Sequence, residues 1–65
     1  MNQKYTVKII NNEKKEIRTQ DVLALDSQEA HKNIFEKINA YTEEILEITD
    51  QDGNCSYNLK NGFVN

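Results

Sequence analysis

One cysteine, Cys55, and one histidine, His31, are the side chains of this sequence best suited to nucleophilic catalysis. A thiolate attacks a substrate efficiently when a neighbouring histidine takes its proton and a third group orients the imidazole. Alternation along the chain predicts that Cys55 faces inward on a strand, where a free cysteine behaves as a small apolar side chain. His31 is expected at the surface or rim of a helix. The sequence predicts no catalytic dyad, and we expect a protein that is not an enzyme.

Residues 50–54, Asp-Gln-Asp-Gly-Asn, resemble the beginning of a calcium-binding loop. Such a loop needs glycine at its sixth position and a bidentate glutamate at its twelfth. Counted from Asp50, these positions hold Cys55 and Asn61. The Asp-Gly pair is instead typical of a tight hairpin turn. The sequence has too few cysteine and histidine residues to bind zinc. It also has no glycine-rich phosphate-binding loop, so we expect no metal or cofactor.

Acidic side chains are concentrated in the C-terminal part of the chain. Residues 1–37 carry seven basic and six acidic groups, a net charge of +1, whereas residues 38–65 carry one basic and five acidic groups, a net charge of -4. Such a run either keeps a small protein soluble or steers it to a basic surface on a partner. The candidate partner-binding residues are Glu43, Glu44, Glu47, Asp50 and Asp52.

Basic side chains gather in the first expected hairpin, where they could contact nucleic-acid phosphates. RNA-binding sheets of this general shape expose aromatic side chains for base stacking, and the expected outer face here carries none. The net charge of -3 also has the wrong sign for a typical nucleic-acid-binding domain. Nucleic-acid binding is therefore the alternative, with Lys4, Lys8, Lys14, Lys15 and Arg18 as its candidate residues.

Period-two alternation predicts a hairpin near the N-terminus. Its first strand covers residues 4–10, with odd-numbered apolar residues facing inward, and its second covers residues 16–25. The register of the second strand stays open. One alternative turns the odd-numbered residues inward and brings Asp21 toward the core, which is costly without a partner. The other is a bulge near residues 19–21 that turns Ile17, Val22 and Ala24 inward.

A helix is expected after the first hairpin. Asp26 and Glu29 have the spacing of a capping box, with Ser27 as a competing cap. We expect the helix to end near Asn39 or Ala40. Its apolar stripe consists of Ala30, Ile34, Ile38 and Tyr41, with Phe35 on its flank.

Two further strands are expected after the helix. The third covers residues 44–50, with Leu46 and Ile48 inward and Ile45 outward. The fourth begins at Cys55 and alternates with Tyr57 and Leu59 on the same inward face. After a second turn at Asn61-Gly62, the last residues, 63–65, form either a strand stub or a docked tail.

Together these elements predict a single α+β domain, residues 1–65, in the order ββαββ. We expect a four-stranded antiparallel sheet with one helix packed on one face. In a chain this short, nearly every large apolar side chain is expected to be needed for the core. The lack of a long apolar run or apolar leader, and the single cysteine, predict a cytoplasmic protein without a membrane span.

In its small size, its composition rich in Asn, Lys, Ile and Glu and its lack of a catalytic set, the chain resembles accessory proteins of phages and mobile elements. This resemblance implies a protein that acts by binding, in some cases by blocking a host enzyme. We expect a small non-enzymatic protein-binding module, an acidic inhibitor or adaptor that docks on a basic surface of its partner. The alternatives are the nucleic-acid-binding module and a structural homodimer without a ligand, whose contact would include outward-facing Ile10 and Ile45.

Overall fold

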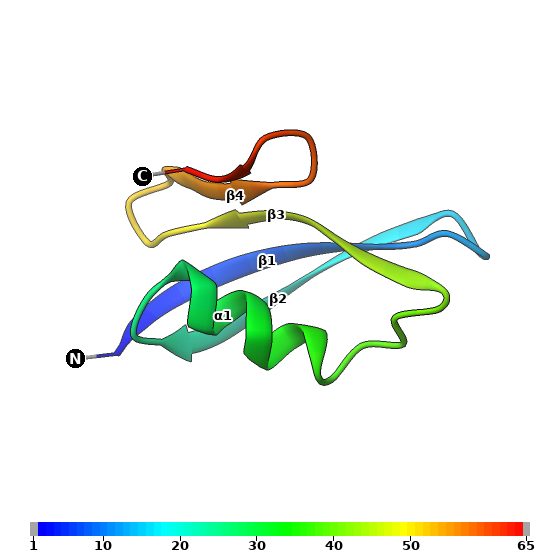
Figure 1. The fold of residues 1–65 in the computed structure, drawn as a ribbon, viewed down its shortest axis with the longest axis horizontal. Helices are drawn as coiled ribbons and strands as arrows, with labels where there is room; N and C mark the ends of the chain where they lie inside the picture. Colours follow the sequence, from blue (N-terminus) through cyan, green and yellow to red (C-terminus); the bar gives the residue numbers. More distant parts are fainter. Residues whose placement is uncertain (1, 65) are drawn as a thin grey trace.

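The computed structural model describes residues 2–64, which form five strands and one helix. The sheet is antiparallel throughout, with the strand order β2-β1-β3-β4-β5, and the helix lies across one of its faces (Figure 1). The elements are β1 (Gln3–Asn11), β2 (Glu16–Ala24), α1 (Ser27–Phe35), β3 (Glu43–Thr49), β4 (Cys55–Asn58) and β5 (Gly62–Phe63).

The hairpin of β1 and β2 has nine consecutive residue pairs without a bulge. Its four-residue turn closes with Lys15 in the left-handed region, at a φ of 56°, and the Asn11 side chain accepts backbone N–H bonds from Glu13 and Lys14. An asparagine that satisfies the backbone in this way favours a tight turn. The predicted polar turn is therefore confirmed.

The register of β2 differs from both alternatives drawn from the sequence. Even-numbered residues of β2 lie on the helix-facing side along the whole strand, so Val22 and Ala24 face inward as the bulge would have required. Ile17, however, lies on the open face opposite Ile10. No bulge is needed because Arg18 and Gln20 are not buried beneath the helix. Asp21 is likewise on the open face.

Helix α1 begins where the sequence predicts but ends earlier. The Asp26 carboxylate accepts the backbone N–H of Glu29 at 2.8 Å, and the Glu29 carboxylate accepts the N–H of Leu25 at 3.3 Å, which confirms the capping interaction. The helix ends at Phe35 instead of near residue 39 or 40. Asn39 organises the following turn by accepting backbone N–H bonds from residues 41–43. Tyr41 is consequently 99% exposed, and its place in the apolar stripe was wrong.

A bulge in β3 reverses the predicted facing of Ile45 and leaves Ile48 inward, as predicted. Lys8 of β1 pairs with Glu47, but the next residue, Ile9, pairs with Ile45, so Leu46 is the extra residue. The parity change lets Ile45 and Ile48 both face the helix and become buried, whereas Leu46 is only partly buried. The expectation that Ile45 faces outward was wrong because alternation alone does not reveal a bulge.

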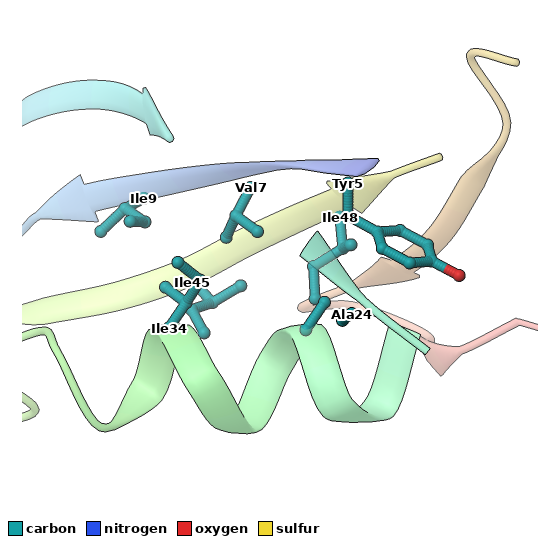
Figure 2. Close-up of a cluster of buried hydrophobic side chains, with 8 residues drawn as sticks. Tyr5, Val7, Ile9, Ala24, Ile34, Ile45 and Ile48 are labelled. Atoms are coloured by element: carbon teal, nitrogen blue, oxygen red, sulfur yellow. The ribbon is translucent and has the colours of Figure 1, made fainter. Parts of the chain in front are cut away.

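The core lies between the helix and the three strands β2, β1 and β3 (Figure 2). Its buried members come from these elements and leave many large apolar residues outside, contrary to the expectation that nearly all are needed inside. The core consists of Tyr5, Val7, Ile9, Ala24, Ala30, Ile34, Ile45 and Ile48. The exposed large apolar residues are Ile17, Leu23, Leu25, Phe35, Tyr41, Leu59, Phe63 and Val64.

The C-terminal strands complete the sheet on its far side. The predicted turns at Gly53 and Gly62 are present, and both glycines have a positive φ. The second turn leads into the short strand β5, which pairs with β4, so the sheet has five strands among residues 2–64 and not four. Cys55 is exposed and pairs with Thr49 on the open face, so its predicted core position was wrong. Asn65 lies outside the described residues.

Candidate protein-interaction surface

The helix covers only part of the sheet. An α-helix is about 10 Å wide, whereas five strands spaced about 4.8 Å apart span roughly 19 Å. Helix α1 packs mainly on β2, β1 and β3, and in Figure 1 β4 and β5 lie beyond it. The helix-facing side of β4 and β5 therefore keeps apolar side chains without a covering element.

Four ring side chains pack together beside the helix at this uncovered end. The His31 ring stacks on Phe35 with centroids 5.9 Å apart, and it meets the edges of Tyr57 at 4.9 Å and Phe63 at 5.6 Å. Tyr57 and Phe63, paired across β4 and β5, have ring centroids 4.8 Å apart. These distances are those of favourable aromatic contacts. His31 thus joins the helix to the C-terminal strands.

A groove of about 250 Å³ runs next to this cluster, and we call it the β4 groove. Phe35 and Leu59 on its walls are each 51% exposed, so about half of each side chain is open to a partner in this concave site. The groove is lined by His31, Phe35, Ala40, Glu43, Glu44, Ile45, Tyr57 and Leu59.

His31 is held in the neutral form more strongly than a free histidine. Its partial burial among the rings lowers its pKa from the usual value of 6.5, because an apolar environment disfavours the imidazolium ion. Cys55 lies on the open face, whereas His31 packs on the helix-facing side. The structure does not bring these two residues together as a nucleophile and its base.

Glu43 is the most strongly anchored member of the acidic run. Its carboxylate accepts the backbone N–H of Asn39 at 3.0 Å and forms an ion pair with Arg18 at 3.1 Å, across the intervening strand β1. These two contacts, the Asn39 bond first, lower the pKa of Glu43 from its usual value. Glu43 therefore fastens β2 and the loop after the helix to β3.

The remaining acidic residues do not form one continuous patch. Glu44 is exposed at the edge of the β4 groove, but it pairs with Ile10 and so lies on the open face, as does Glu47, whose carboxylate is 3.9 Å from Lys8 Nζ. The Asp50 side chain accepts backbone N–H bonds from Asp52 and Asn54 within the β3–β4 turn, at the other end of β3 from Glu43. Only Glu43 and Glu44 line the groove.

The basic residues of the first hairpin are also divided. Lys4 and Lys8 point from β1 on the open face and pair with Asp21 at 3.3 Å and Glu47 at 3.9 Å. Arg18 lies on the other face with Glu43. Lys14 and Lys15 are exposed in the turn. Three of the five candidate phosphate contacts are thus directed toward carboxylates of the same chain.

The described residues contain no group of three or more His, Cys, Asp or Glu side chains able to hold a metal ion. Within residues 2–64, no helix is long and apolar enough to cross a membrane. No protein-family model, curated protein or solved structure matches this chain.

Of the residues that line the β4 groove, only Glu43 and Glu44 were predicted from the sequence to bind a partner. Phe35, Tyr57 and Leu59 were expected on core-facing patterns because their spacing is that of core residues. A usable signal was present, since one helix cannot cover a sheet of four or more strands. The inward-facing residues of the last strand were therefore candidates for an exposed apolar surface.

Proposed function

We propose that this protein is a small binding module that docks on a partner protein through the β4 groove. The observation that carries this function is a concave site lined by half-exposed Phe35 and Leu59 and by partly buried Tyr57, with Glu43 and Glu44 also in its lining. Apolar surface left exposed at such a site marks interaction surfaces in small soluble proteins. The groove fits an inserted side chain better than a flat contact.

The chemistry of the groove defines its partner. An aromatic or leucine side chain would enter between Phe35 and Leu59, since such anchors supply most of the binding energy in interfaces. A lysine or arginine next to the anchor would approach the carboxylates at the groove, Glu43 on its inner side and Glu44 at its edge, of which Glu44 has no ion-pair partner among the described residues. The partner would thus present an apolar anchor flanked by basic residues, in agreement with an acidic inhibitor or adaptor.

Selection from a random peptide library displayed on phage tests this function and requires no purified partner. We expect enriched peptides to share an aromatic or leucine residue followed or preceded by Lys or Arg. Leu59→Ser should weaken binding of the selected peptides by about tenfold or more, since a lost apolar anchor contact costs roughly 1–3 kcal/mol. Glu44→Lys, which reverses a charge at the edge of the groove, should weaken binding by a smaller factor and mainly by slowing association.

Two matched variants serve as controls. Leu25→Ser removes an apolar side chain that is exposed to a similar degree outside the groove, and Glu13→Lys makes the same charge change in the first turn. Both should bind the peptides like the wild type. No enrichment, or peptides whose binding responds equally to all four variants, would rule out docking in the β4 groove.

A further inference from the structure

The outer edge of β2 has the features of a strand that pairs with another strand. It is nine residues long, contains no proline and pairs with β1 without a bulge. Natural proteins usually protect edges with bulges, proline, very short strands or charged side chains. Of these, β2 has only charges, and Arg18 and Asp21 are already paired with Glu43 and Lys4 of the same chain. Along this edge, between β2 and the helix, lies a groove of about 430 Å³ lined by Asp21, Val22, Leu23, Asn33, Glu36 and Lys37.

The hydrogen-bonding direction of β2 follows from its neighbours. Asn12, just after β1, donates its backbone N–H to Thr42, on the side of β3. Backbone groups of successive strand residues point to opposite sides, so even-numbered residues of β1 bond toward β3 and odd-numbered ones toward β2. Given the register, the outward-pointing backbone groups of β2 belong to Ile17, Thr19, Asp21 and Leu23.

The same four residues carry side chains on the open face. Ile17 is 59% exposed and Leu23 is 63% exposed, so both ends of this edge present apolar surface that the monomer does not cover. Between them lie Thr19 and Asp21, and Asp21 already accepts a hydrogen bond from Thr6 and pairs with Lys4. The edge therefore has an apolar–polar–polar–apolar pattern.

We propose that two copies of this chain pair antiparallel through β2, around a two-fold axis at Gln20. In this register Ile17 faces Leu23 of the second copy and Thr19 faces its Asp21, so all four outward-pointing residues form hydrogen-bonded pairs, with about eight interchain bonds. The apolar ends cover each other, and the Thr19 hydroxyl donates to a carboxylate, as Thr6 already does.

The helix-facing side of the same register is also free of directly opposed like charges. Gln20 meets Gln20 of the second copy, and Arg18 faces Val22 of that copy at the mouth of the groove, where Glu36 provides a carboxylate. A register centred on Asp21 would oppose the two Asp21 side chains directly, which is unfavourable. Self-complementarity at Gln20 favours a second copy over an unrelated strand as the occupant.

Sedimentation velocity over about a hundredfold range of protein concentration tests this pairing. It is applied to the wild type, to two charged variants of β2 and to their mixture. The wild-type mass should rise with concentration toward twice the 7.6 kDa of one chain. Ile17→Lys and Leu23→Glu should each raise the dimer dissociation constant about tenfold, because each removes the apolar Ile–Leu cross-strand contact twice per dimer. Since both side chains are exposed on an edge strand, the folded monomer should persist by circular dichroism.

An equimolar mixture of the two variants should dimerise again, since the introduced lysine then faces the introduced glutamate while the other site keeps its Ile–Leu pair. Val64→Lys, which makes the same change at an exposed apolar residue beyond the far edge, should behave like the wild type. A wild type that stays monomeric to millimolar concentration overturns the proposal. So does a mixture that fails to recover the mass of the wild-type dimer.

Discussion

The two outer edges of the sheet differ in length, regularity and cover. At one edge, β2 is nine residues long, pairs regularly and contributes Ala24 to the core beneath the helix. At the other, β5 is two residues long and follows the irregularly paired strand β4, on which the helix leaves an exposed groove. The first edge offers backbone groups to another strand, whereas the second offers side chains. The two ends of the sheet therefore differ in what they leave exposed: backbone groups along β2, and side chains beside β4, where the helix does not reach.

Removing a side chain that joins the helix to the sheet should have the largest effect on this asymmetry. Ile34 is fully buried between the helix and the sheet (Figure 2), so Ile34→Ala should lower the free energy of unfolding by about 2–5 kcal/mol. Leu59→Ala, at the half-exposed groove, should cost about 0.5 kcal/mol. Urea denaturation followed by circular dichroism measures both. Equal losses would show that the β4 end is packed as tightly as the core.

The helix N-terminus provides the next largest effect. Asp26→Ala removes the carboxylate that accepts the Glu29 N–H and should destabilise the protein by about 1 kcal/mol. Ser27→Ala is the matched control, because the cap is Asp26 and Ser27 is already inside the helix. It should change the unfolding free energy much less. If the Ser27 variant loses as much as the Asp26 variant, Asp26 is not the residue that caps the helix.

The aromatic contact between β4 and β5 should contribute less, and only locally. Phe63→Ala removes the contacts of its ring with Tyr57 and His31, and aromatic pairs are worth about 0.5–1.5 kcal/mol. Amide hydrogen exchange should accelerate in β4 and in the turn that follows it, with little change in β1. Uniform acceleration along the chain would mean that the β4 end and the core unfold as one unit.

The smallest effect is the pH dependence that comes from His31. Its pKa in the folded protein lies below the usual 6.5, so the unfolded chain takes up a proton first as the pH falls. The stability due to neutral His31 is present above about pH 6.5 and is lost as the pH falls toward the lowered pKa. His31→Phe keeps a ring in the cluster without a titrating group.

Denaturation at several pH values between 7.5 and 5.5 should therefore show a falling unfolding free energy for the wild type and a smaller slope for His31→Phe. Glu43 contributes in a separate range. Its lowered pKa means that its stabilisation is present above about pH 4.5, its usual value, and is lost at more acidic pH in both proteins. Identical slopes above pH 5.5 would exclude His31 as the source.

The sequence was informative where local signals decide the structure. The start of the helix, the two glycine turns and the inward face of β1 were all predicted correctly, since each depends on neighbouring residues, and the structure decides the open choice of cap in favour of Asp26 over Ser27. The errors arose where distant parts of the chain decide. A bulge opposite Ile9 turned Ile45 inward, and the pairing of β4 placed Cys55 on the open face. Neither event leaves a signal in the local alternation.

The candidate site was predicted only in part for the same reason. Charge in the acidic run can be read directly from the sequence, and Glu43 and Glu44 do line the β4 groove. The acidic residues are divided between the two faces of the sheet, and this division depends on the strand register, which could not be predicted from the sequence. The walls of the groove depend on how far the helix extends over the strands, which is a property of tertiary packing.

Residue-resolved NMR titration with a peptide from the phage selection tests the central claim most directly. If the protein binds through the β4 groove, the backbone and side-chain signals of His31, Phe35, Tyr57 and Leu59 should shift together with increasing peptide. Signals of β2 should stay unchanged at a fixed protein concentration. Shifts confined to β2, or spread over the open face near Lys4 and Lys8, would contradict the account.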